Sequence, residues 1–195
     1  MAQNRLGEAL GVDRVAGCSV LKLIALSAVI AVSTAERAKG GAMSFQISST
    51  AFSSGQMIPK KFTCDGSDVS ADLSWKDAPP GTKSFALIMD DPDAPAGTWV
   101  HWVLYNIPAE TKELPEAMPK QEQLPDGALQ GHNSFRKIGY GGPCPPPGKP
   151  HHYYFKLYAL DTKPDLKAGA SKGEVERAMK GHVLGETELI GRYGR

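Results

Sequence analysis

The chain has 195 residues, 41% of them hydrophobic, and its 22 basic and 21 acidic residues give a net charge of +1. Because these charges are interspersed and no basic run could follow a phosphate backbone, the sequence argues against nucleic acid as a partner. Residues 1–42 differ in character from the rest, which leaves about 150 residues, the usual size of one domain. Such a domain buries roughly 70% of its unfolded surface and needs neither a metal nor a disulfide to fold.

The first recognisable element is an apolar run near the N-terminus. Ten apolar or small residues, 23–32, follow a lysine and precede a Ser-Thr-Ala triplet. A charged flank, an apolar run too short to span a bilayer and a small-x-small site are typical of a secretory signal peptide, with cleavage after Ala35. The sequence therefore predicts a signal-like or disordered segment over 1–42 and a periplasmic or secreted protein. Translation from Met43 would instead give a cytoplasmic protein.

The chain has three cysteines, Cys18, Cys64 and Cys144, and no C-x-x-C pair that would suggest a structural zinc site. Two of them, Cys64 and Cys144, remain if the first segment is cleaved. In an oxidising compartment these two could form a disulfide, although the sequence does not give its geometry. In the cytosol both would be ordinary thiols.

From residue 44 onward, short apolar or alternating runs are separated by loops rich in proline and glycine. The clearest runs are SFALIMDD, WVHWVLYNIP and HYYFKLYALD, at 84–91, 99–108 and 152–161, and such runs are typical of β-strands. This pattern predicts a mainly β domain over 43–195, an antiparallel sandwich rather than a repeating βαβ unit.

One helix is indicated near the C-terminus, where Ser171 and Glu174 have the spacing of a capping box. Further residues then recur at helical spacing, namely Val175, Ala178, Met179 and His182. The last residues, 184–195, are expected to pack this helix back on the sheet, with Leu189 and Ile190 pointing inward.

Polar residues occur between the first two of these predicted strands, where 84–91 ends and 99–108 begins. Asp91 ends one strand, and the loop after it is braced by Pro95. Alternation along the next strand places Trp99, His101 and Val103 on one face and Val100, Trp102 and Leu104 on the other. His101 is therefore expected to share a face with Trp99. Taken singly, a strand histidine is commonly structural and an aspartate before proline commonly caps a turn.

A second polar group follows a proline-rich loop in the stretch YGGPCPPPGKPHHYYF. Alternation places His151 and Tyr153 on one face of the third strand and His152 on the opposite face. Imidazole and phenol groups donate hydrogen bonds to anions, and a carboxylate can orient an imidazole through its other nitrogen. Gly142 would let a backbone N–H approach the same ligand closely. The two stretches together predict a small polar pocket.

Two long motifs also match a known family in order. They are DPDAP, which begins at Asp91 and is followed by WVHWVLYNIP, and GYGGPCPPPGKPHHYYFKLYALD. With these motifs the sequence resembles the phosphatidylethanolamine-binding proteins, which include the Raf kinase inhibitor proteins, and it resembles their bacterial and archaeal branch most. The resemblance runs roughly from Phe45 to the C-terminus. FTCDGSDVSADLSW is similar too, although Ala71-Asp72 stands where the bacterial pattern more often has prolines.

The resemblance implies two antiparallel sheets with peripheral helices, including a C-terminal one, and a small anion pocket. Carried over residue by residue, the pocket would contain Asp91, Pro95, Trp99, His101, His151 and Tyr153. His152 stands where the family usually has arginine. Family members bind phosphate-like or carboxylate anions and phosphorylated head groups, and some eukaryotic members inhibit kinases or a serine carboxypeptidase. Bacterial relatives suggest a homodimer.

We therefore expect a binding protein, without cofactor or catalytic activity, whose ligand carries a phosphate, carboxylate or phosphoethanolamine-like group. Three alternatives stay open. The surface loops could inhibit a protein kinase or protease, which the fold alone does not establish. A His/Asp-dependent hydrolase would have Cys144 as its candidate nucleophile, since no G-x-S-x-G motif is present. A metal could be held by His101, His151 and Asp91, although their spacing matches no metal signature.

Overall fold

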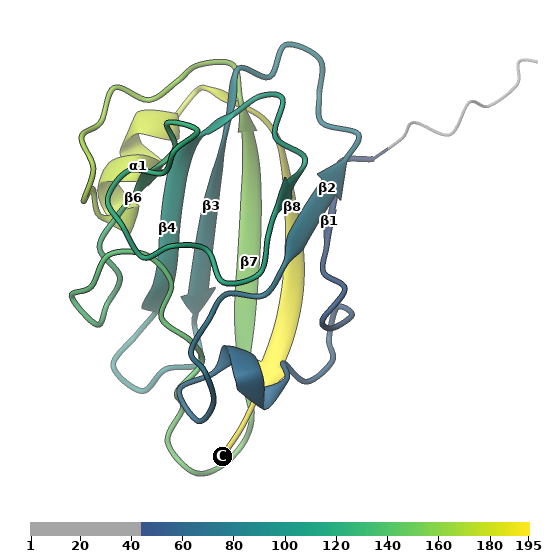
Figure 1. The fold of residues 1–195 in the computed structure, drawn as a ribbon, viewed down its shortest axis with the longest axis vertical. Coiled ribbons are helices and arrows are strands. Elements are labelled where there is room, and N and C mark those ends of the chain that lie inside the picture. The colour runs from purple at the N-terminus through teal and green to yellow at the C-terminus, as the bar shows by residue number, and fades with distance from the viewer. Residues whose placement is uncertain (1–43) are drawn as a thin grey trace, which may run out of the picture. The chain divides into compact units, whose positions relative to one another are not determined.

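The computed structural model describes residues 44–195, which form two antiparallel β-sheets (Figure 1). The smaller sheet has the order β1–β2–β5, with β1 at Gln46–Ser48, β2 at Leu73–Lys76 and β5 at Glu113–Leu114. The larger sheet has the order β6–β4–β3–β7–β8, with bounds Leu129–Gln130, Trp99–Pro108, Ser84–Asp91, His151–Leu160 and Val183–Tyr193. The predicted mainly β fold of two antiparallel sheets is confirmed.

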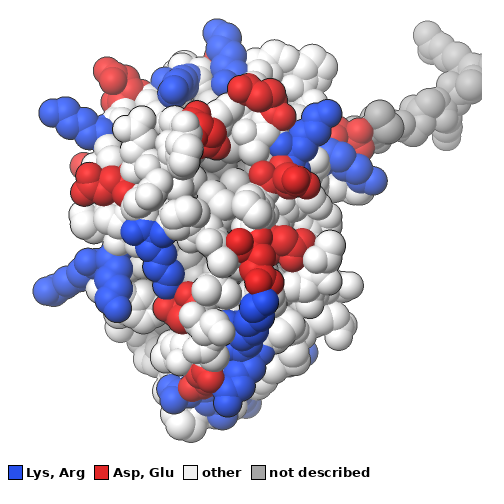
Figure 2. Space-filling model, in the orientation of Figure 1, with Lys and Arg blue, Asp and Glu red and all other residues white. Residues whose placement is uncertain are grey.

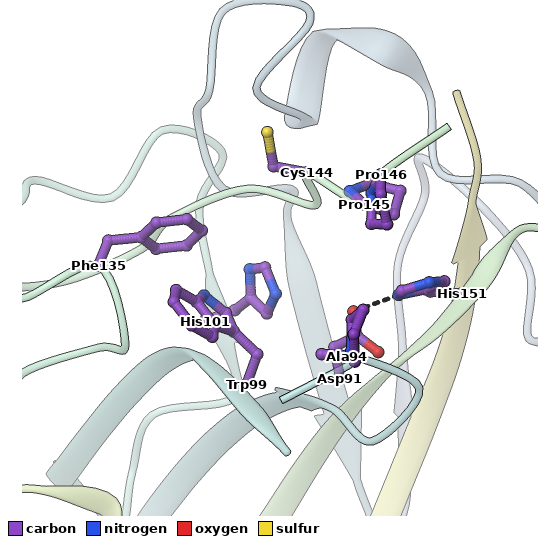
Figure 3. Close-up of a pocket in the computed structure, with 10 residues that line it drawn as sticks. Asp91, Ala94, Trp99, His101, Phe135, Cys144, Pro145, Pro146 and His151 are labelled. Carbon is purple, nitrogen blue, oxygen red and sulfur yellow. Dashed lines mark hydrogen bonds and ion pairs between the residues drawn. The ribbon is translucent and has the colours of Figure 1, made fainter. Parts of the chain in front are cut away.

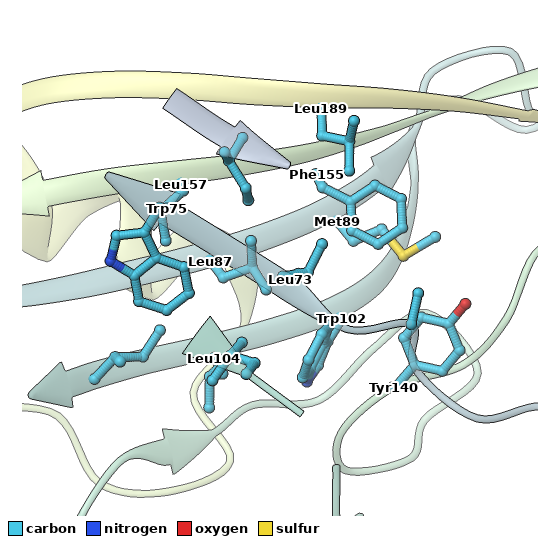
Figure 4. Close-up of a cluster of buried hydrophobic side chains, with 14 of the residues drawn as sticks. Leu73, Trp75, Leu87, Met89, Trp102, Leu104, Tyr140, Phe155, Leu157 and Leu189 are labelled. Atoms are coloured by element: carbon cyan, nitrogen blue, oxygen red, sulfur yellow. The ribbon is translucent and has the colours of Figure 1, made fainter. Parts of the chain in front are cut away.

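The main core lies between the two sheets and is drawn in Figure 4. Leu73 and Trp75 of β2 pack there against side chains of the larger sheet such as Leu87 and Phe155. Every residue of β3 is buried, because alternate side chains of this central strand enter the main core and a second cluster on the opposite face. In β7, by contrast, buried and partly exposed residues alternate, as the sequence pattern indicated.

The second cluster forms where helix α1, Lys172–Met179, covers the outer face of the larger sheet. Ser171 caps this helix and forms the predicted capping box with Glu174. Val175 and Met179 supply its buried face. The helix ends at Met179, so His182 does not belong to it. A short 3-10 helix, η1, occupies Lys60–Phe62.

The expectation for the last residues was wrong in one respect. They form β8, which pairs along β7, with Leu189 opposite Phe155 and Ile190 opposite Tyr154. Since neighbouring residues of a strand face opposite sides of a sheet, the two side chains cannot both point inward. Leu189 is buried in the main core, and Ile190 is only partly buried on the other face.

A β-bulge in β4 corrects the predicted faces of that strand. Met89 of β3 pairs with Trp102, but the next residue, Asp90, pairs with Val100, so that His101 is the extra residue. Trp102 and Leu104 accordingly enter the main core, whereas Val100 and Val103 pack in the cluster beneath α1. The expected grouping of Val103 with His101, and of Val100 with Trp102, was wrong because strict alternation fails at a bulge.

The predicted signal-like segment over 1–42, its cleavage after Ala35 and Cys18 all lie outside the described residues. Between residues 44 and 195, no helix has the length and apolar character that crossing a membrane requires. The face drawn in Figure 2 carries basic and acidic side chains close to one another, in keeping with the interspersed charges of the sequence.

Candidate functional site

A cavity of about 170 Å³ opens at the end of the larger sheet where β3 ends and β4 and β7 begin (Figure 3). Its walls come from the loop after β3, the start of β4, a loop residue beyond β6 and the proline-rich loop that leads into β7. The lining residues are Asp91, Ala94, Pro95, Trp99, His101, Phe135, Cys144, Pro145, Pro146 and His151.

Asp91 and His151 form the polar pair of this cavity. His151 Nδ1 lies 2.8 Å from Asp91 Oδ2, and both side chains are largely buried. Because a carboxylate accepts, Nδ1 carries the hydrogen of a neutral ring and Nε2 remains for another partner. The second carboxylate oxygen, Asp91 Oδ1, accepts from the backbone N–H of Asp93 at 2.8 Å. Both oxygens of Asp91 are thus engaged within the protein, and the carboxylate orients the imidazole.

His101 is the second imidazole and is almost fully buried. Its Nδ1 donates to the carbonyl oxygen of Gly141 at 2.7 Å, while the N–H of Gly141 donates to the carbonyl oxygen of His101 at 2.9 Å. Its ring stands edge-to-face against Tyr153 and Phe135, with centroids 5.2 and 5.5 Å away. Burial lowers the pKa of His101 below its usual 6.5, so the neutral ring with a free Nε2 is favoured at pH 7.

Two buried polar groups at this site have no hydrogen-bond partner among residues 44–195, Trp99 Nε1 and the hydroxyl of Tyr153. Trp99 lines the cavity and packs edge-to-face on Phe135, with centroids 5.3 Å apart. Burial, and then the nearby Asp91 carboxylate, raise the pKa of Tyr153, so its hydroxyl stays protonated. Buried donors are nearly always paired in native proteins, so unpaired ones beside a cavity are unusual.

Five of the predicted site residues line one cavity, namely Asp91, Pro95, Trp99, His101 and His151. Tyr153 is not part of the lining, because it lies fully buried against the His101 ring. His152 turns to the other face of β7, as alternation predicted, and its Nδ1 lies 2.7 Å from Asp93 Oδ2.

Gly142 is the one predicted residue that lies elsewhere. Its N–H donates to Asp68 Oδ1 at 2.7 Å, so it is not directed at a ligand in the cavity. A Cβ at this position would come within 2.6 Å of the carbonyl oxygen of Phe62. The absence of a side chain therefore serves close packing against η1 and not close approach to a ligand.

Phe135, Ala94 and the two prolines after Cys144 were not predicted to line the site. The prolines lie inside the recognised loop motif, so their place was readable from the sequence. Phe135 had no such signal, because it lies in an irregular loop and reaches the cavity only through the fold. Asn133 shapes that loop by accepting hydrogen bonds from the N–H groups of Phe135 and Lys137 at 3.0 and 3.1 Å.

Cys144 is joined to Cys64 by a disulfide, with Cα atoms 5.4 Å apart. Cys144 is therefore not a free nucleophile in this structure, which removes the support for a cysteine-dependent hydrolase. The suggested metal site also lacks support, since within residues 44–195 no group of three or more histidine, cysteine or acidic side chains is arranged to hold a metal ion.

The sequence of this chain matches a known protein family and several of its members. The profile of the phosphatidylethanolamine-binding proteins matches residues 48–194. A UPF0098 protein of Methanothermobacter thermautotrophicus is 54% identical over 145 residues, which cover 74% of this chain and 95% of the relative. The UPF0098 protein YbcL of Escherichia coli is 38% identical over 178 residues, 87% of this chain and 93% of the relative.

Two solved structures are similar as well. A phosphatidylethanolamine-binding protein homologue from Chlamydia trachomatis superposes with a TM-score of 0.71 at 40% identity, covering 78% of this chain and 98% of the other. The structure of Escherichia coli YbcL gives a TM-score of 0.73 at 37% identity, with 77% and 98% covered. The family matches nearly the whole described part of the chain, and so the chain belongs to the phosphatidylethanolamine-binding protein family.

Proposed function

We propose that this protein binds a small ligand through a phosphate or carboxylate group held in the cavity between Asp91, Trp99, His101 and His151. The observation that carries the proposal is the convergence of polar atoms without partners on one small cavity. Trp99 Nε1 is buried and unpaired among the described residues, and the contacts of Asp91 and Gly141 leave Nε2 of each cavity histidine free of a role in the fold. An anion accepts from the N–H of Trp99 and, once the histidines are protonated, from their Nε2–H groups as well.

The size of the cavity limits what can enter. A volume of about 170 Å³ accommodates a phosphate or carboxylate group with a short substituent, since one water occupies about 30 Å³ in the liquid. Apolar side chains such as Trp99, Phe135 and Pro145 form much of the wall. They exclude water and so strengthen each hydrogen bond inside.

The protonation states of the cavity histidines determine how the affinity for an anion changes with pH. At neutral pH the ring of His101 is kept neutral by burial, so its Nε2 accepts a hydrogen bond and suits a ligand oxygen that still carries a proton. Protonation turns a histidine Nε2 into a charged donor, and charge-assisted hydrogen bonds are about twice as strong as neutral ones. An anion should therefore bind more tightly as the pH falls.

Calorimetric titration tests the proposal. Inorganic phosphate, acetate and phosphoethanolamine are titrated at pH 5.5 and 7.5, with ethanolamine as a ligand that lacks the anion. We expect the three anions to bind more tightly at pH 5.5 and ethanolamine not to bind. Binding that is the same at both pH values, or that requires only the amine, would contradict an anion site.

His151→Ala supplies the matched test of the site, and His182→Ala its control. His182 also pairs with a carboxylate, Asp161 Oδ1 at 2.8 Å, but this pair is exposed and does not line the cavity. Loss of a hydrogen bond to a charged group costs about 1.5–3 kcal/mol, so we expect about tenfold or greater weakening for His151→Ala. His182→Ala should bind like the wild type. If the two substitutions weakened binding equally, the ligand would not bind in this cavity.

A further inference from the structure

The disulfide lies in the wall of the cavity itself. Cys144 lines the cavity together with Pro145 and Pro146, which follow it in the proline-rich loop 143–150. His151 comes directly after this loop at the start of β7. The position of the loop therefore sets both the closure of the cavity and the environment of its polar pair.

The loop forms few hydrogen bonds with the rest of the fold. Five of its eight residues are prolines, which carry no N–H to donate. Of the three N–H groups that remain, only that of Gly148 donates within the described part of the chain, to the carbonyl oxygen of Arg195 at 3.3 Å. At the other end, the carbonyl oxygen of Pro143 accepts from Cys64 N at 3.1 Å. Besides the packing of the buried Pro145, the disulfide is thus the main link between the middle of the loop and the rest of the fold.

Cys64, the other half of the bridge, belongs to a well-anchored part of the fold. It follows η1, whose Phe62 is buried in the main core and accepts a hydrogen bond on its carbonyl oxygen from the Tyr140 hydroxyl at 2.6 Å. The next residue, Asp65, accepts from the Tyr193 hydroxyl at 2.8 Å and pairs with Arg195 Nε at 3.2 Å. The disulfide therefore ties a sparsely bonded loop to a rigid frame.

Both cysteines are exposed, so a reductant can reach the bond. Exposed disulfides are the ones that are reduced most readily. The guanidinium Nη1 of Arg195 approaches Cys144 Sγ at 4.0 Å. A nearby cation favours the thiolate form of a cysteine, which makes Cys144 the better leaving sulfur.

We propose that reduction of the Cys64–Cys144 disulfide releases the 143–150 loop and weakens ligand binding in the cavity, so that the redox state of this bond regulates the site. A dithiol reductant attacks Cys64 Sγ as a thiolate and expels the thiolate of Cys144. Its second thiolate then resolves the mixed disulfide and frees Cys64. Two electrons and two protons pass to the protein sulfurs, and the reductant becomes a disulfide.

The loss of affinity on reduction follows from how well the 143–150 loop is ordered before the ligand binds. In the oxidised form the wall formed by Pro145 and Pro146 is already in place when the ligand arrives. In the reduced form, binding must also order the loop, and this conformational entropy is subtracted from the binding free energy. His151 itself stays paired with Tyr193 in the sheet, so the wall moves and the histidine does not. This inference rests on the proposed function, because it concerns the affinity of the same cavity.

The first measurement needs no ligand. The rate at which diethyl pyrocarbonate modifies His151 is compared, by peptide mass spectrometry, between the oxidised wild type and the folded Cys64→Ser/Cys144→Ser variant. The His151 side chain is 12% exposed and that of His182 is 48% exposed, so His182 serves as an internal reference. We expect His151 to react several-fold faster in the variant and His182 to react at an unchanged rate. An unchanged His151 rate would overturn the proposal.

The second measurement is titration with inorganic phosphate. It uses oxidised wild type, wild type reduced with dithiothreitol, and the double serine variant with and without dithiothreitol, each checked by circular dichroism to be folded. Because binding to the reduced form must also order part of the loop, we expect about tenfold or greater weakening on reduction. The double serine variant should bind phosphate with the affinity of the reduced wild type, and dithiothreitol should not change that affinity.

The outcomes separate the two ideas. Phosphate that binds equally to oxidised and reduced protein would overturn redox regulation and leave the proposed function intact. Phosphate that binds neither form would overturn the proposed function and, with it, any redox effect on affinity. Weaker binding on reduction, together with faster modification of His151, would support the regulation.

Discussion

Asp90 and Asp91, adjacent residues at the end of β3, turn their buried carboxylates to opposite faces of the larger sheet. Asp91 faces the cavity and accepts from His151 Nδ1. Asp90 faces the helix side, where it binds Lys156 Nζ at 3.2 Å and Lys172 Nζ at 2.5 Å. Of these two neighbours, one therefore belongs to the candidate ligand site and the other anchors α1. Substituting each residue in turn separates the two roles.

Asp91→Asn should weaken phosphate binding while the fold persists. The amide keeps the shape of the side chain but loses the charge that orients and supports His151. We expect about tenfold weaker binding, the scale of a hydrogen bond to a charged group. Calorimetric titration at pH 5.5 measures it. Asp161→Asn, which alters the exposed partner of His182, is the control. If both variants bind like the wild type, Asp91 does not support the site.

Asp90→Ala should lower the free energy of unfolding and leave phosphate affinity nearly unchanged. The substitution leaves the ammonium groups of Lys156 and Lys172 without their shared buried partner. Removing one member of a buried ion pair typically costs about 3–5 kcal/mol, and the partial exposure of both lysines reduces this to about 2–3 kcal/mol here. Urea unfolding gives the value. A loss below about 1 kcal/mol would show that this ionic cluster does not anchor α1.

The buried His101 should make stability depend on pH. Since the pKa of His101 is lowered in the folded protein, the unfolded chain binds more protons at pH values between the folded pKa and 6.5. Stability should therefore be fully present above pH 6.5 and fall as the pH drops through this window. Urea unfolding at several pH values measures the slope.

His101→Gln supplies the comparison for that slope, because glutamine does not titrate. We expect the variant to show a shallower fall in stability between pH 7 and pH 5. Added phosphate should also reduce the slope in the wild type, because an anion favours the protonated ring. The same slope in both proteins would assign the pH dependence to other groups.

Gly142→Ala should destabilise the protein without abolishing phosphate binding by the folded fraction. The added Cβ would meet the carbonyl oxygen of Phe62 at 2.6 Å and Asp68 Oδ1 at 2.7 Å. Overpacking of this kind costs about 1–3 kcal/mol. Gly173→Ala is the control, because its Cβ would meet only a side-chain atom of Arg177 at 3.5 Å and it lies in a helix. Specific loss of phosphate affinity at unchanged stability would instead return Gly142 to the ligand site.

The sequence by itself determined the elements whose signals are local. Strands 84–91 and 99–108 have the predicted bounds, and the third begins one residue earlier than predicted, at His151. The capping box located the start of α1, because it depends on residues three positions apart. Alternation correctly placed His151 and Tyr153 on one face of β7 and His152 on the other, because β7 is regular along this stretch.

Only the tertiary structure decided how these elements meet. The bulge at His101 depends on how β3 and β4 pair, and it places Val100 and Val103 on the same face of the sheet, where alternation had put them on opposite faces. Phe135 enters the cavity from an irregular loop, and Gly142 turns its N–H to Asp68 because η1 packs beside it. The Cys64–Cys144 bridge spans 80 residues of sequence. The periodicity of a sequence depends on residues close together in the chain, and it therefore predicts single strands and helices. These contacts join residues far apart in the chain, so their geometry is fixed by the packing of the whole domain.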